Sequence, residues 1–290
     1  MAAPAFILNY LPLQITLVSI KKAKLPPFLG STLRGAIGQA LIKEKLVYNF
    51  LFNNKSLSQG QQDIPNPYLL DLPDTNKFEF EPSEELIFKI LLLGEASEYT
   101  QAMINALKEK EIGLGAARYP FILKQVKHEI DQRIIWKDGS FYEEAVCSTF
   151  LPYRALPNVK RAILRTRTPL RIRRNGQLLT EIDFVTIIRN ITNRLMSLTS
   201  RYGGWVDEIE VQRIQDLASQ VEIVHRDFEL KDLTRYSNRL GEKVDFSGLM
   251  GSIEVQGDLT PFVPWLFAAQ TLHLGRNTTF GMGKIEVEFI

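Results

Sequence analysis

The stretch HLGRNTTFGMGKIEVEFI, residues 273–290, decides the fold of this chain. It begins with a glycine-containing loop and continues, over residues 284–290, as an alternating run of polar and apolar residues, which is typical of a half-buried strand. A helix is predicted just before the loop, because Asp258 or Thr260 can cap a segment that has Pro261 in its first turn. The chain therefore ends with a helix, a glycine loop and a strand.

The first half of the chain ends in the same order. The segment GLGAARYPFIL, residues 113–123, follows a predicted helix over 97–110 and opens a predicted strand over 118–126. Upstream of it the sequence predicts, in order, a strand over 14–20, a helix with Leu33, Ile37, Leu41 and Leu46 on its apolar face, a polar excursion over 53–76 with one strand, and a strand over 86–93. Gly35 and Gly38 lie within that helix and indicate close packing against it. This is the βαββαβ order of a ferredoxin-like domain.

The second half repeats this order with little sequence identity. Strands are predicted over 162–168 and 170–174 with a turn at Asn175 and Gly176, then a helix from Asp183 to Ser200, strands over 221–230 and 252–255, and the terminal helix and strand. We therefore predict an α+β protein of two tandem ferredoxin-like (βαββαβ, RRM-like) domains. The N-terminal domain is expected over residues 1–150, and the C-terminal domain, with the glycine-rich loop, over residues 151–290.

Composition excludes several classes of protein. The 290 residues are 45% hydrophobic and 23% charged, with 35 Lys and Arg against 33 Asp and Glu, which excludes a disordered tail, a coiled coil and a generic polycation. Cys147 is the single cysteine, so the chain has no internal disulfide and no multi-cysteine zinc site. The uncharged first 20 residues contain Pro4 and Pro12 and no basic stretch, which is a poor signal peptide or membrane span. We expect a cytoplasmic protein without a membrane partner.

The small net charge conceals one basic segment. Residues 145–180 contain no Asp or Glu and eight cations: Arg154, Lys160, Arg161, Arg165, Arg167, Arg171, Arg173 and Arg174. Subtracting these eight charges from the formal total of +2 leaves −6 for the rest of the chain. Strand alternation places Arg165 and Arg167 on one outward face and Arg171 and Arg173 on another. Such a surface binds the phosphates of RNA or DNA, although a charged edge that prevents aggregation has the same composition.

The glycine-rich loop also allows two interpretations. Tight turns alone account for Gly275, Gly281 and Gly283, and the loop lacks the order of a nucleotide-binding fingerprint. It also supplies hydrogen-bond donors and an aromatic face, from Arg276, Asn277, Thr278, Thr279 and Phe280. That combination favours contact with a nucleic-acid backbone.

Several segments resemble one family. The segment TPLRIRRNGQLL, residues 168–179, and the run over 235–288 resemble the C-terminal domain of the sixth Cas family, the CRISPR-associated endoribonucleases that process precursor CRISPR RNA. FLGSTLRGAIGQAL, residues 28–41, and the segment GLGAARYPF are similar to the same family and to its RAMP superfamily, so that the resemblance covers nearly the whole chain. It implies that CRISPR repeat RNA is held by Gly275, Arg276, Asn277, Thr278, Thr279, Gly281 and Gly283, together with Arg165, Arg167, Arg171, Arg173, Arg235 and Arg239.

The resemblance also implies an activity. Family members cleave each repeat without a metal or cofactor, by attack of the ribose 2′-hydroxyl on the adjacent phosphate. They commonly keep a catalytic histidine near the end of the first helix, whereas this chain has no histidine before position 128. Lys45 and Tyr48 lie near that place, and His273 lies in the best-matching motif, so these three residues are the catalytic candidates. The alternative is a RAMP subunit that holds CRISPR RNA, with other Cas proteins of an effector complex as partners, and cleaves nothing.

Overall fold

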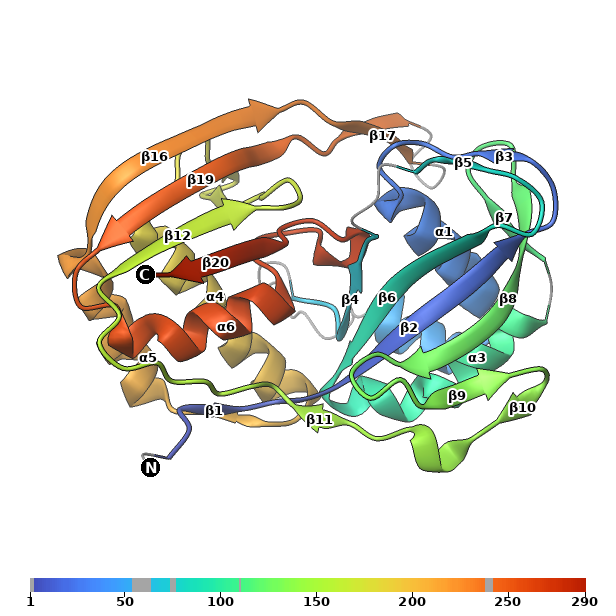
Figure 1. Ribbon diagram of the computed structural model, residues 1–290, viewed down its shortest axis with the longest axis horizontal. Coiled ribbons are helices and arrows are strands. Elements are labelled where there is room, and N and C mark those ends of the chain that lie inside the picture. Colours follow the sequence, from blue (N-terminus) through green and yellow to red (C-terminus); the bar gives the residue numbers. More distant parts are fainter. Residues whose placement is uncertain (1–2, 54–63, 74–76, 110, 238–241) are drawn as a thin grey trace. The chain divides into compact units, whose positions relative to one another are not determined.

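The computed structural model describes residues 3–53, 64–73, 77–109, 111–237 and 242–290 (Figure 1). It divides into two compact units. The N-terminal unit comprises Leu8–Phe150 and Arg201–Gly204, and the C-terminal unit comprises Met1–Ile7, Leu151–Ser200 and Trp205–Ile290. No helix in the described ranges is both long enough and apolar enough to cross a membrane.

The N-terminal unit is built on one antiparallel sheet. Its elements are β2 (Asn9–Ser19), β3 (Ala23–Lys24), α1 (Gly30–Leu41), α2 (Lys45–Phe52), β4 (Tyr68–Asp71), β5 (Glu79–Phe80), β6 (Glu85–Leu93), η2 (Gly94–Tyr99), α3 (Thr100–Lys108), β7 (Ile112–Leu114), β8 (Tyr119–His128), β9 (Ile134–Lys137), β10 (Ser140–Phe141), η3 (Glu143–Ala145) and β11 (Thr149–Phe150). The sheet runs β10-β9-β8-β2-β6-β4. Within it, β8-β2-β6-β4 is the ferredoxin-like order, and this part of the predicted fold is confirmed.

The first helix differs from its prediction at its end. Helix α1 stops at Leu41 and α2 starts at Lys45, so Leu46 does not continue the apolar face and its side chain is 82% exposed. A methyl group on Gly38 would lie 3.1 Å from the Phe52 ring, so a neighbouring residue does pack closely there. At Gly35 a methyl group would meet no atom within 4 Å, so the same expectation is wrong for Gly35.

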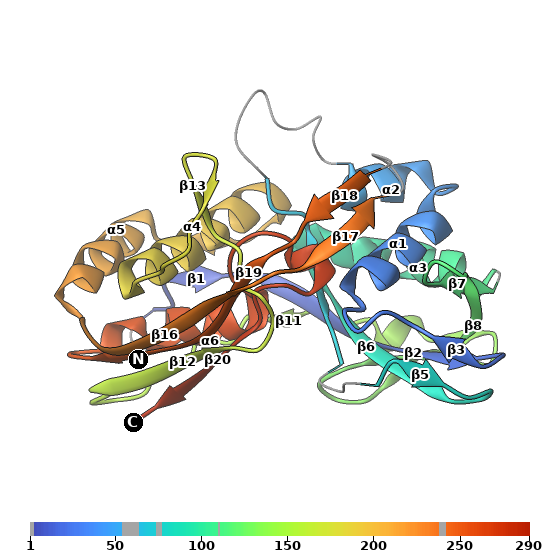
Figure 2. The same cartoon turned by 90° about the horizontal axis from the view of Figure 1, so that it is seen from above.

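The C-terminal unit has a second antiparallel sheet. Its elements are β1 (Phe6–Ile7), β12 (Arg161–Thr166), β13 (Arg173–Arg174), β14 (Gln177–Leu178), α4 (Phe184–Tyr202), β15 (Trp205–Val206), α5 (Glu208–Leu217), η4 (Ala218–Gln220), β16 (Glu222–Lys231), β17 (Thr234–Ser237), β18 (Glu242–Asp245), β19 (Gly248–Gln256), η5 (Thr260–Phe262), α6 (Val263–Leu272), η6 (Thr278–Phe280) and β20 (Ile285–Phe289). The sheet order β16-β19-β12-β20 is again ferredoxin-like, and α4 and α6 lie on one side of it (Figure 2).

Three features of this unit were not predicted. Helix α5, which Asp207 caps by accepting hydrogen bonds from the Ile209 and Glu210 backbone N–H groups, is an addition to the fold. Residues 170–174 do not form one strand, because Leu170 makes only an isolated bridge and β13 begins at Arg173. Residues 1–7 were expected in the N-terminal domain, whereas β1 pairs with β15 of the C-terminal unit.

Candidate RNA interface

The outward face of β12 carries the first group of predicted RNA-binding arginines. Ala162 and Leu164 are buried, while Arg161, Arg165 and Arg167 face outward, as the alternation predicts. Each guanidinium, however, has a carboxylate from a neighbouring strand: Arg161 pairs with Glu254, Arg165 with Glu288 at 2.8 Å, and Arg167 with Glu286 at 3.8 Å. The predicted guanidinium surface is therefore a mosaic of opposite charges, which attracts phosphate far less than unpaired arginines would.

Arg171 is also placed differently from its prediction. It was expected on an outward face with Arg173, but its side chain is buried, because the alternation of a strand does not apply to residues outside β12 and β13. Its guanidinium donates to the Ser247 carbonyl and, at 2.6 Å, to the Asp245 carboxylate. Burial alone would raise the pKa of Asp245, but hydrogen bonds from Ser247 and Arg171 outweigh it and lower this pKa to about 2. Arg171 therefore stabilises the unit from inside.

A row of polar side chains on α4 binds both the β13–β14 hairpin and the glycine-rich loop. Thr186, Asn190 and Arg194 follow one another at intervals of four residues, so they share one side of the helix. The Arg174 guanidinium donates to Thr186 Oγ1 at 3.0 Å, and the Gly275 N–H donates to Asn190 Oδ1 at 2.7 Å. The third residue, Arg194, donates to the Leu272 carbonyl at 3.0 Å and to Thr278 Oγ1 at 2.9 Å. The β13–β14 hairpin and the glycine-rich loop are thus fixed along the same helix.

The glycines of the loop are required by close backbone packing. Gly275 has a φ of +72°, and a methyl group there would lie 2.4 Å from the Arg171 carbonyl oxygen. At Gly283, where φ is +75°, the methyl group would lie 1.8 Å from the Leu274 carbonyl oxygen. The Arg276 N–H donates to the Arg171 carbonyl at 2.7 Å. The loop is therefore a rigid structure whose shape depends on Gly275 and Gly283.

Only part of the loop is accessible to a ligand. Thr278, Thr279 and Phe280 are buried, and the Phe280 ring packs edge-on against Phe246, with 4.9 Å between ring centroids, so it offers no stacking face to RNA. Gly281 and Gly283 are buried as well, which gives them a role in shape and not in contact. The accessible groups are those of Arg173, Arg174, Asn190, Arg194 and residues 275–277, which we call the α4–loop surface. Of the other predicted residues, Arg235 lies in β17 opposite Val244, and Arg239 lies outside the described residues.

The three catalytic candidates belong to different units. His273 is 2% exposed and its Nδ1 lies 3.3 Å from the Met282 carbonyl oxygen, so its imidazole packs inside the C-terminal unit. Its φ of +58° and ψ of 167° belong to a region that almost only glycine adopts, so the surrounding loop holds it under strain. Lys45 and Tyr48 lie on α2 of the N-terminal unit, where Lys45 is exposed and Tyr48 is half-buried and stacked on Phe52, with 5.5 Å between ring centroids.

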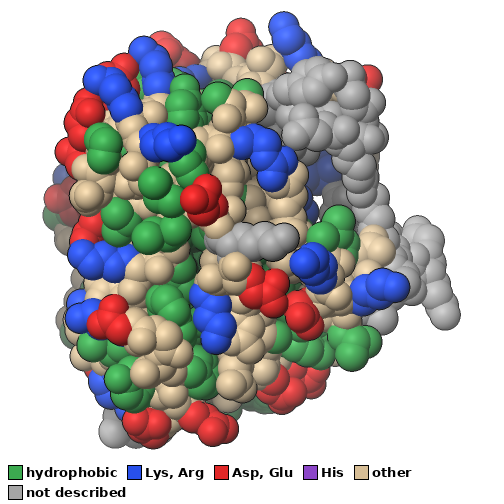
Figure 3. Space-filling model, turned by 90° about the vertical axis from the view of Figure 1, so that its right-hand side faces the viewer, with side chains coloured by type: hydrophobic (Ala, Val, Ile, Leu, Met, Phe, Trp, Pro, Cys, Tyr) green, Lys and Arg blue, Asp and Glu red, His purple; other side chains and the backbone are tan. Residues whose placement is uncertain are grey.

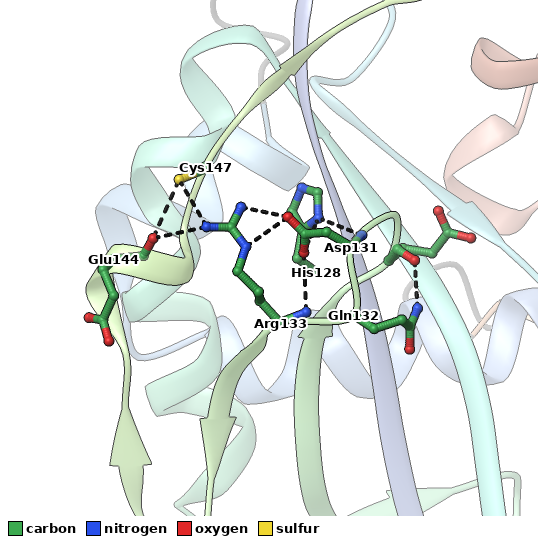
Figure 4. Close-up of polar contacts among 7 residues, drawn as sticks. His128, Asp131, Gln132, Arg133, Glu144 and Cys147 are labelled. Carbon is green, nitrogen blue, oxygen red and sulfur yellow. Dashed lines mark hydrogen bonds and ion pairs between the residues drawn. The ribbon is translucent and has the colours of Figure 1, made fainter.

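A histidine–carboxylate pair does occur at the β8–β9 turn (Figure 4). His128 is 4% exposed, and its Nδ1 lies 3.0 Å from Asp131 Oδ1. Hydrogen bonds from Arg133, above all, lower the pKa of Asp131 to about 2. Arg133 also donates to the Glu144 carbonyl at 3.4 Å and lies 3.9 Å from Cys147 Sγ. Because His128 Nε2 is buried, this pair cannot reach a substrate and instead fixes the turn.

One further face of the molecule has a mixed charge. On the side of the molecule that lies to the right in Figure 1, basic and acidic side chains are interspersed (Figure 3). Within the described ranges, no group of three or more His, Cys, Asp or Glu side chains converges in a way that could hold a metal ion. The α4–loop surface therefore remains the best candidate for a nucleic-acid interface.

The chain has two ferredoxin-like units, and the second has a glycine-rich loop between its last helix and its last strand. Residues 164–285 match the family of the CRISPR-associated endoribonuclease Cas6, which confirms the resemblance found in the sequence. Residues 8–147 match a family described as an N-terminal domain. The Cas6 match includes both β13–β14 and the glycine-rich loop.

Solved structures share the fold. A Thermus thermophilus Cas6 in a product complex superposes with a TM-score of 0.58 at 14% identity, over 96% of this chain and 100% of that one. A second Cas6 product complex gives a TM-score of 0.56 at 19% identity, over 96% and 99%. A chain of a partial Cas6-RT-Cas1–Cas2 complex gives 0.62 at 12% identity, over 100% of this chain and 47% of that one. No curated protein sequence gave a significant match.

Proposed function

We propose that this protein binds CRISPR repeat RNA and cleaves precursor CRISPR RNA within each repeat to release guide RNAs. The observation that carries the proposal is the Cas6 family match over residues 164–285, which spans every segment of the α4–loop surface. That surface offers guanidinium and amide groups, and its segments are held on α4 by the hydrogen bonds from Arg174 to Thr186 and from the Gly275 N–H to Asn190. Guanidinium and amide groups are donors that hold a sugar–phosphate backbone.

Binding in this proposal depends on the α4–loop surface more than on β12. Arg173 is exposed on β13, and Arg276 and Asn277 are half-buried in the loop. Arg165 and Arg167 already have carboxylate partners, so RNA would have to displace Glu288 and Glu286 before it could bind them.

A paired comparison of charge reversals tests this ranking. Arg173→Glu with Arg276→Glu is expected to weaken binding of labelled repeat RNA at least tenfold and to flatten its salt dependence. Arg165→Glu with Arg167→Glu reverses the same number of charges and is expected to have a smaller effect. Equal losses in the two double variants would contradict the ranking.

Cleavage is proposed to follow the 2′-hydroxyl route. The ribose 2′-oxygen attacks phosphorus while its proton passes to a base, and the 5′-oxygen leaves with a proton from an acid. The products are a 2′,3′-cyclic phosphate and a 5′-hydroxyl. The exposed Lys45 ammonium can stabilise the charged phosphorane or protonate the leaving oxygen, and the Tyr48 hydroxyl lies one helical turn further along α2. The buried His273 is no longer a candidate for direct contact.

The deciding experiment is cleavage of 5′-labelled repeat RNA by the full chain in EDTA. A single cut with a cyclic phosphate on the upstream fragment supports the proposal, and no product at stoichiometric protein refutes it. If the cut appears, Lys45→Ala and Tyr48→Phe are each expected to slow it by more than tenfold. Lys43→Ala on the same segment serves as the matched control.

The second candidate is a binding subunit without nuclease activity. It is favoured by the burial of His128 and His273, which leaves His225 on β16 as the exposed histidine of the chain. Tight repeat binding with no cleavage would establish it, and association with other Cas proteins would then be expected. His225→Ala tests whether any cleavage depends on this exposed histidine.

A further inference from the structure

Strand β16 forms one edge of the C-terminal sheet, and the described part of the chain places no strand beside its outer side (Figure 1). It is 10 residues long, whereas β20 at the opposite edge has 5 residues. The edge at β20 is also partly closed, because the Val287 backbone N–H donates to Gln270 Oε1 of α6 at 3.0 Å. A long open edge such as that of β16 is a template on which another strand can add.

The direction of the backbone groups shows which residues of β16 can take a further strand. Leu249 of β19 exchanges two backbone hydrogen bonds with Leu170, at 2.8 and 2.9 Å, so its N–H and C=O both point away from β16. Leu230 lies opposite Leu249, and its own N–H and C=O therefore point to the outer edge. Since these directions alternate along a strand, the same holds for Phe228 and Arg226. A second strand can form hydrogen bonds with these residues.

The side chains along this edge separate charged from apolar groups. Phe228 and Leu230 lie on the helix side of the sheet, where Phe228 is half-buried and Leu230 is 44% exposed. Asp227, Glu229 and Lys231 alternate with them on the other side and are exposed. Among the described residues these three charges have no ion-pair partner, in contrast to the outward arginines of β12. The strand therefore offers charges of both signs to a neighbour.

We propose that β16 is a dimer interface, on which β16 of a second copy of this chain adds as an antiparallel strand. With Glu229 on the two-fold axis, Asp227 faces Lys231 of the second copy, and Phe228 faces its Leu230. The symmetry repeats both contacts, and a single like-charge contact, between the two Glu229 side chains, opposes them. Because the strand is complementary to itself, a second copy satisfies it without any other protein. The contact does not depend on RNA.

The two neighbouring registers fit less well. A register with Leu230 opposite itself pairs only residues 229–231 of each strand and sets Phe228 against a carboxylate that lies beyond the strand. A register with Phe228 opposite itself sets Asp227 against Glu229 twice, and like charges that face each other across two strands destabilise the pair. The register centred on Glu229 therefore uses more of the strand and opposes fewer like charges.

A charge exchange across the interface tests this pairing. The dimer Kd of the full chain is measured without RNA by sedimentation velocity over a wide range of protein concentration. Asp227→Lys and Lys231→Asp each replace two attractive contacts by two repulsive ones, so each variant alone is expected to raise the Kd about tenfold. In an equal mixture of the two variants every Lys again faces an Asp, and the mixed dimer is expected to recover the wild-type Kd. Lys160→Asp and Asp258→Lys reverse the same kinds of charge at another ion pair of this unit, and as controls they should leave the Kd unchanged.

A wild type that stays monomeric at every protein concentration would overturn the proposal, and so would a mixture that associates no more than its two components. Glu229→Gln reports on the register. It removes the like-charge contact and is expected to lower the Kd, whereas a higher Kd would mean that Glu229 pairs with Lys231 and that the proposed register is wrong. All substituted side chains are exposed, so the variants are expected to fold. Since no RNA is present, failure of this interface leaves the proposed RNA-binding function untouched.

Discussion

Replacing Gly275 by alanine tests whether backbone contact gives the glycine-rich loop its shape. Gly275 has a φ of +72°, and the new methyl group would lie 2.4 Å from the Arg171 carbonyl oxygen. That separation is impossible without a shift of the loop or of the segment that contains Arg171. Either shift breaks the hydrogen bonds from the Gly275 N–H to Asn190 and from the Arg276 N–H to Arg171.

The expected loss of stability has two parts. The left-handed backbone costs about 1 kcal/mol for a residue with a Cβ atom, and each of the two broken hydrogen bonds contributes about 1 kcal/mol. Gly275→Ala should therefore lower the free energy of unfolding of the C-terminal unit by about 3 kcal/mol. Gly176, in the β13–β14 hairpin, has a φ of +79°, but a methyl group there would meet no atom within 4 Å. Gly176→Ala should therefore cost only the backbone part, about 1 kcal/mol.

The measurement is urea unfolding followed by tryptophan fluorescence, because Trp265 is fully buried in the C-terminal unit. The free energy of unfolding of Gly275→Ala is expected to be about 2 kcal/mol lower than that of Gly176→Ala. Repeat-RNA binding should weaken in Gly275→Ala under conditions where both variants are folded. If Gly275→Ala costs no more than Gly176→Ala, the close approach to Arg171 does not hold in solution and the rigid-loop reasoning is refuted.

Two further predictions concern the N-terminal unit. Gly35→Ala should raise the free energy of unfolding by about 0.5–1 kcal/mol, because alanine favours the helix and its methyl group meets no neighbour. Gly38→Ala should raise the free energy of unfolding less, because its methyl group would lie 3.1 Å from Phe52. Thermal unfolding of both variants measures this difference. The lowered pKa of Asp131 means that its ionised form stabilises the fold above its ordinary pKa of 3.8, and that this contribution is lost as the pH falls through about 2. Acid titration of Asp131→Asn should therefore show a weaker loss of stability between these values than the wild type, and an identical titration would contradict the stabilising role of Arg133.

The order of elements was predictable because helices and strands have different local periodicities. A few neighbouring residues were enough to identify the alternation in β12 and the turn at Asn175 and Gly176. Asn175 and Gly176 both have a positive φ. The neutral surface of β12 was missed, because the partners of its arginines come from distant segments. Arg165 and Glu288 are 123 residues apart in the sequence.

A signal for that pairing was nevertheless present in the quoted C-terminal stretch. Glu286 and Glu288 alternate with buried Ile285 and Val287, so both glutamates face outward on the last strand. In a ferredoxin-like sheet the last strand lies beside the first, which places these carboxylates next to the outward arginines of β12. The predicted topology, applied to side chains, would therefore have predicted that carboxylates of the last strand neutralise the outward arginines of β12. The burial of Arg171 and His128 could not be found in this way, because both depend on irregular segments.

The distribution of charge also determines how strongly RNA binding should depend on salt. The α4–loop surface of the C-terminal unit contributes Arg173, Arg174, Arg194 and Arg276. Four phosphate contacts on single-stranded RNA predict a slope of log K against log salt of about −3. A much steeper slope would require cations outside this surface, such as the exposed Arg189 of α4. A much shallower slope would mean that neutral donors such as the Asn277 amide carry the binding, and the arginines of this surface would then have a structural role.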